Sequence, residues 1–324
     1  MKTLTIITAG IALIAALGCS AQAIDYPQRP VRIIVPFAPG GAVDVIARII
    51  AQKLSERPGS QFYVENVAGA GGDIGARAAV RAAPDGQTLL VATAPDLVVR
   101  SLIRANPPYD PVASFAPITL VATTPAMITV HPSVSAKSMM ALIDLLKANP
   151  GKYSYGTPGY GTIPHLDGER LFRQTFGLDV VHVPFQGAGP AVASSVAGQT
   201  AILGAPLPLV APYVKDGTLR ALAIASNARS ADFPDVPTLA EAGIANQVGG
   251  ATVGAYAPAK TPKNIIELLH SRLVAIVSLP EVRARLTTLG FEPVATTPKE
   301  FATWINAEHS KWSEVVRASN IRID

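Results

Sequence analysis

Four glycine-rich loops are the segments of this sequence best suited to bind a ligand. Each follows a short apolar run and precedes a segment with helical periodicity: Pro39-Gly40-Gly41, Gly69-Ala70-Gly71-Gly72, Pro158-Gly159-Tyr160-Gly161 and Gln186-Gly187-Ala188-Gly189. The first N–H groups of a helix have no partner within the helix, so a helix that begins at such a loop can hold a carboxylate or phosphate oxygen. The loops therefore predict capture of a small anion without catalytic side chains. Alternatively, the glycines only permit tight turns between strand and helix.

Few titratable side chains accompany these loops. Asp44 falls in the first turn of the helix expected after Gly41, where it can act as a general base or hydrogen-bond backbone N–H groups, and we favour the second role. His165 and Glu169 are four residues apart and could share a metal ion, but no third ligand accompanies them. We therefore expect His165 to orient its loop, and we predict no metal or other cofactor. The glycine spacing over residues 69–75 does not match a dinucleotide site.

Alternating strand and helix patterns position the loops. Residues 31–35 form a mostly β-branched run, and apolar residues in 42–54 then recur on one helical face. The same order follows residues 62–66, 153–156 and 180–184. Strand–helix alternation of this kind predicts parallel sheets with right-handed crossovers, whose ligands lie at the carboxyl ends of the strands.

Two apolar stretches indicate that the chain crosses between two lobes. The first is residues 120–130, interrupted at Thr124-Pro125, and the second is residues 252–258. We expect one lobe to comprise residues 24–124 plus 250–324 and the other to comprise residues 125–249, with a cleft between them. Further strands are expected at 201–209 and 219–225, and an irregular segment at the prolines between 107 and 117.

Composition indicates an exported globular protein. The 324 residues are 49% hydrophobic and 15% charged, and the net charge of +4 is scattered, so nucleic-acid binding is not expected. Lys2 and the apolar run that follows resemble a secretory signal over residues 1–23, with cleavage after Ala23. Cys19 lies in a weak lipoprotein-like site, an alternative that we favour less. We therefore expect an exported protein, for which the family resemblance described next implies the periplasm.

Ordered motifs along the whole mature chain resemble one family. They are Tyr26-Pro27, Val35-Pro36-Phe37, Glu65-Asn66, Pro84-Asp85-Gly86, Pro150-Gly151-Lys152, His165-Leu166, His182-Val183-Pro184, Asp235-Val236-Pro237-Thr238 and Lys311-Trp312. This pattern resembles the Bug family of periplasmic solute-binding receptors, which are associated with tripartite tricarboxylate transporters. The resemblance implies an α/β, two-lobed periplasmic binding-protein fold of type II, with two parallel or mixed sheets flanked by helices. It also implies a receptor rather than an enzyme.

The resemblance further implies which residues hold a ligand carboxylate. The first group surrounds the loop after the first strand and the loop before the first helix of the second lobe: Phe37, Ala38, Pro39, Gly40, Gly41, Asp44, Gly161, Thr162 and His165. Ala68 and Pro184, Phe185, Gln186 and Gly187 would complete the pocket, with Tyr160, Ala205 and Pro206 beside it.

Two departures from the family pattern bear on the ligand. This chain has Ala205 near the position where amino-acid-binding relatives carry an Asp that can pair with the ligand ammonium, and it has Thr252 where relatives often have Trp. We therefore predict a mono- or dicarboxylate without an α-amine, aliphatic or aromatic, that a monomeric receptor delivers to membrane transporter subunits or a sensor kinase. The alternative is a secreted two-lobed enzyme that acts on a carboxylate through Asp44 or His165.

Overall fold

The computed structural model describes residues 26–244 and 249–319. The predicted signal segment and its cleavage site lie outside the described residues. In chain order the elements are β1 (Val31–Val35), α2 (Ala42–Ser55), β2 (Phe62–Asn66), η1 (Ala70–Gly72), α3 (Asp73–Val80), β3 (Thr88–Thr93), α4 (Ala94–Leu102), β4 (Phe115–Val130), α5 (Met139–Lys147), β5 (Ser154–Thr157), α6 (Ile163–Gly168), η2 (Glu169–Thr175), β6 (Val181–Pro184), α7 (Ala188–Val196), β7 (Ile202–Pro206), α8 (Leu207–Lys215), β8 (Arg220–Ala225), β9 (Gly250–Pro258), α9 (Lys263–Ser278), α10 (Pro280–Thr288), β10 (Glu292–Pro293) and α11 (Pro298–Ser319).

The first half of the molecule is a sheet with helices on both faces. Its strand order is β2-β1-β3-β9-β4, with β1 parallel to β2 and β3, and β9 antiparallel to its neighbours. Side chains of a strand alternate between faces, and β1 shows the result: Val31, Ile33 and Val35 pack with α2 and α9, whereas Ile34 packs with α3, α4 and α11. The predicted β-branched strand is thus buried on both faces.

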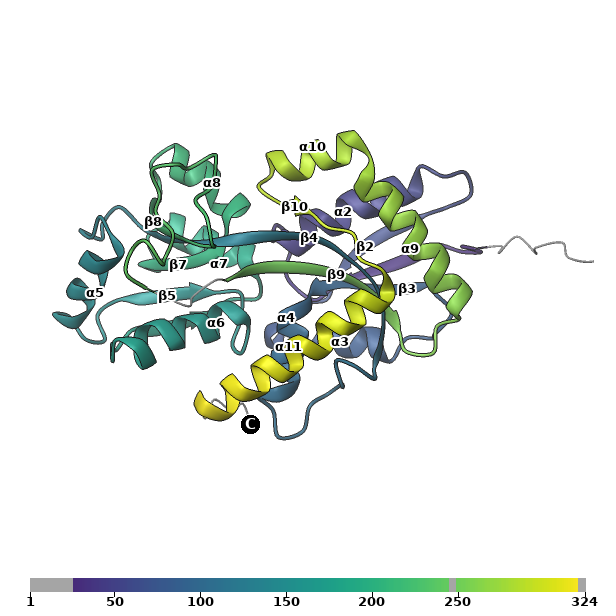
Figure 1. The fold of residues 1–324 in the computed structure, drawn as a ribbon, viewed down its shortest axis with the longest axis horizontal. Coiled ribbons are helices and arrows are strands. Elements are labelled where there is room, and N and C mark those ends of the chain that lie inside the picture. The colour runs from purple at the N-terminus through teal and green to yellow at the C-terminus, as the bar shows by residue number, and fades with distance from the viewer. Residues whose placement is uncertain (1–25, 245–248, 320–324) are drawn as a thin grey trace, which may run out of the picture.

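The second half repeats this design around β4, β7, β8, β5 and β6. Helices α5 and η2 cover one face of this sheet, and α7 and α8 cover the other. β5 runs parallel to β6 and β7, whereas β4 is antiparallel to β7 and β8. Figure 1 shows the two halves side by side, with β4 and β9 running between them.

The long strand β4 joins the halves by changing its partners. It pairs with β9 up to Pro125 and with β7 and β8 from Ala126 onwards. The two crossing strands touch closely here, since a Cβ atom at Gly250 would collide with the Thr124 carbonyl oxygen. The division into lobes at residues 124/125 and 249/250 stays a prediction, and this change of partners is consistent with it.

The structure corrects three predicted elements. β4 is continuous from Phe115 to Val130, although a break was expected at Thr124-Pro125. The expected strand 201–209 ends at Pro206 and is followed by the helix α8, because a short apolar run fits either state. Helix α4 was not predicted. Within residues 26–244 and 249–319, no helix combines the length and the apolar character that crossing a membrane requires.

Candidate functional site

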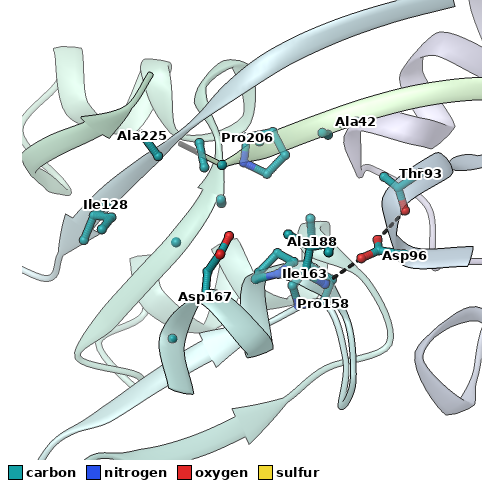
Figure 2. Close-up of a pocket in the computed structure, with 18 of the residues that line it drawn as sticks. Ala42, Thr93, Asp96, Ile128, Pro158, Ile163, Asp167, Ala188, Pro206 and Ala225 are labelled. Atoms are coloured by element: carbon teal, nitrogen blue, oxygen red, sulfur yellow. Dashed lines mark hydrogen bonds between the residues drawn. The ribbon is translucent and has the colours of Figure 1, made fainter. Parts of the chain in front are cut away.

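A central cavity opens where the two halves meet, and its walls are mainly apolar (Figure 2). Its space amounts to about 1130 Å³, which includes the part open to solvent. Strand ends and helix starts from both halves form its walls: Phe37, Gly41, Ala42, Val43, Asp44, Thr93, Pro95, Asp96, Ala126, Ile128, Tyr155, Gly156, Pro158, Ile163, Pro164, Asp167, Gly168, Leu171, Phe172, Ala188, Ile202, Gly204, Ala205, Pro206, Ala225, Leu239, Gly249, Gly250 and Ala251. Concave apolar sites with a few polar groups are typical of small-molecule binding.

Two helix N-termini supply the positive end of the cavity. Helix α2 begins after Gly41 and helix α7 begins after Gly187, and neither has a side-chain cap. The two starts lie together, because a Cβ atom at Gly41 would be 3.8 Å from both the Cβ and the backbone nitrogen of Ala188. Their first N–H groups and dipoles can therefore hold a carboxylate. None of the described residues that line the cavity is Lys, Arg or His.

The Asp44 side chain fixes the loop before α2. Its carboxylate accepts hydrogen bonds from the backbone N–H of Gly40 (3.1 Å), from Arg48 (2.9 Å) and from Asn66 (2.9 Å). Burial raises the pKa of Asp44, but these hydrogen bonds outweigh burial and the pKa is lowered. Asn66 also donates to the Phe37 carbonyl at 3.0 Å. Asp44 thus has the structural role that we favoured.

The Asp96 carboxylate connects the two halves. One oxygen accepts the Ile163 N–H at 2.6 Å, which supplies a cap for α6, and the other accepts the Thr93 hydroxyl. Burial raises the pKa of Asp96, although its hydrogen bonds and Arg100 act in the opposite direction. Both carboxylate oxygens are therefore already engaged by the protein.

A buried ion cluster lies behind Asp96. Asp73, at the start of α3, accepts two hydrogen bonds from Arg100 at 2.6 and 2.7 Å and pairs with Arg104 at 2.7 Å. The remaining guanidinium nitrogen of Arg100 donates to the carbonyl oxygen of Tyr160, on the loop before α6. The cluster therefore holds this loop against α4.

His165 lies beneath its own loop. Its Nδ1 accepts the Gly161 N–H at 3.0 Å, and its ring stacks on His182 with centroids 4.1 Å apart. Burial lowers the pKa of both rings to about 4, so both are neutral at pH 7. Within the described residues no cluster of three or more His, Cys, Asp or Glu side chains could hold a metal ion. The hydrogen bond from Gly161 gives His165 the loop-orienting role that we expected for it.

The structure separates the predicted ligand residues into two groups. Phe37, Gly41, Asp44, Ala205 and Pro206 line the cavity. The others are not among the residues that line it: Ala38, Pro39, Gly40, Ala68, Tyr160, Gly161, Thr162, His165, Pro184, Phe185, Gln186 and Gly187. A ligand role stays a prediction for both groups.

The glycine loops of the two halves contact one another. Ala38 donates its N–H to the Gln186 carbonyl at 2.8 Å. A Cβ atom at Gly189 would lie 2.8 Å from the Pro39 carbonyl oxygen, and one at Gly159 would lie 2.9 Å from the Gly71 Cα. The four glycine loops thus meet in pairs, and only glycine permits this close approach.

Two acidic residues of the cavity wall, Asp96 and Asp167, were missed from the sequence. Thr93-Ala94-Pro95-Asp96 has the threonine-x-x-acid pattern of a helix start, so α4 had a detectable signal. The sequence signal for Asp167 was weaker. Ile163, Asp167 and Leu171 share one helical face by spacing and line the cavity, whereas the chemistry predicted for this helix concerned His165 and Glu169 on another face.

Residues 46–321 match the model of the family described as tripartite tricarboxylate transporter family receptor. The sequence is similar to protein BugT of Bordetella pertussis, with 35% identity over 95% of each chain.

Similar solved structures point the same way. Periplasmic binding protein BugD has 30% sequence identity and a TM-score of 0.86, and the match covers 92% of this chain and 99% of BugD. A Rhodopseudomonas palustris protein with bound malate has 30% identity and a TM-score of 0.85, and the match covers 90% of this chain and 99% of that protein. An R. palustris protein with adipate has 28% identity and a TM-score of 0.87, and the match covers 92% of this chain and 99% of that protein. The predicted periplasmic binding-protein fold is confirmed.

Proposed function

The chain belongs to the family of tripartite tricarboxylate transporter receptors, and we propose that it captures a small organic carboxylate in the central cavity. The expectation of a receptor rather than an enzyme is confirmed by this family. The observation that carries the carboxylate proposal is the meeting of two helix N-termini without side-chain caps, at Gly41 and Ala188, in a cavity with apolar walls.

The energetics of that corner suit an anion. One helix N-terminus contributes about 0.3 to 1 kcal/mol to an exposed anion and up to about 2 kcal/mol to a partly buried one. Hydrogen bonds from N–H groups to a charged oxygen are about twice as strong as neutral ones. Adipate and malate, the ligands of two similar R. palustris proteins, are carboxylates and agree with this chemistry.

We further propose that the ligand is a mono- or dicarboxylate, aliphatic or aromatic, without an α-amine. Ala205 lies in the cavity wall and offers no charge to an ammonium group. Asp96, the carboxylate on the α4 side, is engaged by Thr93 and by the Ile163 N–H. An α-ammonium next to the bound carboxylate would therefore lose its water without gaining a free acceptor.

We also propose export to the periplasm and delivery of the ligand to membrane transporter subunits or a sensor kinase. The basis is the signal-like segment over residues 1–23 together with the receptor family. The intact mass of the exported protein tests the processing: we expect a chain that begins at Ile24. A mass that begins at Cys19 and includes lipid would show the lipoprotein alternative.

Calorimetry with refolded protein, free of carried ligand, tests the binding site. We expect amine-free carboxylates to bind more tightly than their α-amino analogues and to be recovered chemically unchanged. Tighter binding of glutamate than of glutarate would refute the amine-free proposal, and turnover of the ligand would favour the enzyme alternative.

A proline substitution tests the anion corner directly. Ala42 is the first residue of α2, a position where proline fits the helix but removes an N–H group. We expect Ala42→Pro to weaken carboxylate binding while the protein stays folded. Lys263→Pro makes the same change at the exposed first residue of α9 and is the matched control. Equal affinity of both variants would count against this corner as the carboxylate site.

A further inference from the structure

The Asp167 carboxylate occupies the other end of the central cavity. A Cβ atom at Gly249 would lie 2.8 Å from Asp167 Oδ2 and 3.8 Å from the Ala225 Cβ, so these residues form one corner. Figure 2 shows Asp167 extending into the cavity on the side of Ala225 and Ile128, whereas Ala42, Thr93 and Asp96 lie on the opposite side. A ligand anchored at the α2 start therefore extends its far end toward Asp167.

Asp167 has no hydrogen-bond partner for its carboxylate among residues 26–244 and 249–319. Asp167 forms an ion pair with Arg170, but Nη2 of Arg170 lies 3.6 Å from Oδ1, which is beyond normal hydrogen-bond distance. The side chain is 28% exposed although it lies deep in the molecule, because it faces the open cavity. A carboxylate in such an apolar setting needs a partner, and the cavity is where one can come from.

The charges around Asp167 act on it without supplying a hydrogen bond among the described residues. Burial raises its pKa to about 6, and Asp96 on α4 adds to the increase, while Arg170 and Lys311 on α11 oppose it. At pH 7 the group is therefore mainly ionised. Among the described residues that line the cavity, Asp44 and Asp96 use their carboxylate oxygens within the protein, so Asp167 is the acidic group there that has no hydrogen bond.

We propose that Asp167 forms a second polar subsite that selects a carboxylate whose far end carries a hydrogen-bond donor, either a hydroxyl or an ammonium group. This inference rests on the proposed function and narrows its ligand class. A donor at the far end satisfies the carboxylate of Asp167, a methyl group leaves it unpaired, and a second ionised carboxylate repels it.

Matched ligands that differ only at the far end test the proposal. One aliphatic set is hexanoate, 6-hydroxyhexanoate, 6-aminohexanoate and adipate; a shorter set is butanoate, 4-hydroxybutanoate, 4-aminobutanoate and succinate. The aromatic set is benzoate, 4-hydroxybenzoate, 4-(aminomethyl)benzoate and terephthalate. In calorimetry at pH 7.5 we expect a hydroxyl or ammonium member of at least one set to bind about 10- to 100-fold more tightly than its methyl- or hydrogen-ended and dicarboxylate counterparts.

The variant Asp167→Asn keeps the shape of the side chain and removes its charge. We expect it to lose the preference for the ammonium ligand and to gain affinity for the dicarboxylate. Asp232→Asn, at an exposed position in the same half of the molecule, is the matched control and should keep the wild-type order.

The outcomes separate this inference from the proposed function. If carboxylates bind but no donor-ended member of any set is preferred, or if Asp167→Asn keeps the wild-type order, the second subsite is refuted and carboxylate capture stands. If no carboxylate of any set binds, the proposed function fails and the subsite fails with it.

Discussion

Removing the charge of Asp73 should destabilise the protein strongly. The Asp73 and Arg100 side chains are only 4% and 2% exposed, and Arg104 is 22% exposed. Asp73→Asn keeps the size of the side chain but leaves two guanidinium groups without their carboxylate. Breaking a buried ion pair by removing one partner costs about 3 to 5 kcal/mol, because a buried charge is left uncompensated.

The magnitude follows from burial rather than from the number of ion pairs. The pair between Lys263 and Glu267 is also an ion pair, but its side chains are 90% and 63% exposed. Exposed pairs at this helical spacing contribute about 0.3 to 0.5 kcal/mol. Glu267→Gln is therefore the matched control, and we expect its cost to be several times smaller than that of Asp73→Asn.

Urea unfolding followed by circular dichroism measures both costs. In a thermal scan, each kcal/mol of lost stability should lower the melting temperature by roughly 2 °C, so that of Asp73→Asn should fall by about 6 to 10 °C. Arg100 also donates to the Tyr160 carbonyl, so ligand affinity should weaken as the loop before α6 loosens. If Asp73→Asn costs no more than Glu267→Gln, the cluster does not stabilise the fold and this reasoning is wrong.

Three further results are expected. Burial lowers the pKa of His165 and of His182 to about 4, against 6.5 in the unfolded chain. The contribution of the two neutral rings to stability is therefore complete above pH 6.5 and should be lost as pH falls toward 4. An unfolding free energy that stays constant over that range would contradict this. Gly189→Ala should raise the ligand dissociation constant, because its Cβ would lie 2.8 Å from the Pro39 carbonyl oxygen and would push apart two loops that border the cavity; unchanged affinity in calorimetry would show that this loop contact does not shape the ligand site. If Asp167 holds an ammonium group, 6-aminohexanoate should bind about tenfold more weakly at pH 5 than at pH 7, because the Asp167 pKa is about 6; constant affinity would oppose that contact.

Local sequence determined the repeated unit of this protein. The apolar run 31–35 forms a strand because its residues bury both faces, and the helix after Gly41 forms because its apolar residues share one face. A glycine before a helix supplies no capping side chain, so helix starts with N–H groups free to meet an anion could be predicted without coordinates. The ordered motifs also identified the receptor family.

Tertiary structure decided which of these features meet. Helical spacing shows that Ile163, Asp167 and Leu171 share a face, but only packing places that face, and not the one with His165, on the cavity. Short apolar runs do not distinguish strand from helix, so residues 207–209, the start of α8, were wrongly predicted as strand. The contacts of Asp96 with Ile163, and of Arg100 with the Tyr160 loop, join residues more than fifty positions apart. No local pattern encodes such pairings, because they depend on how the two halves dock.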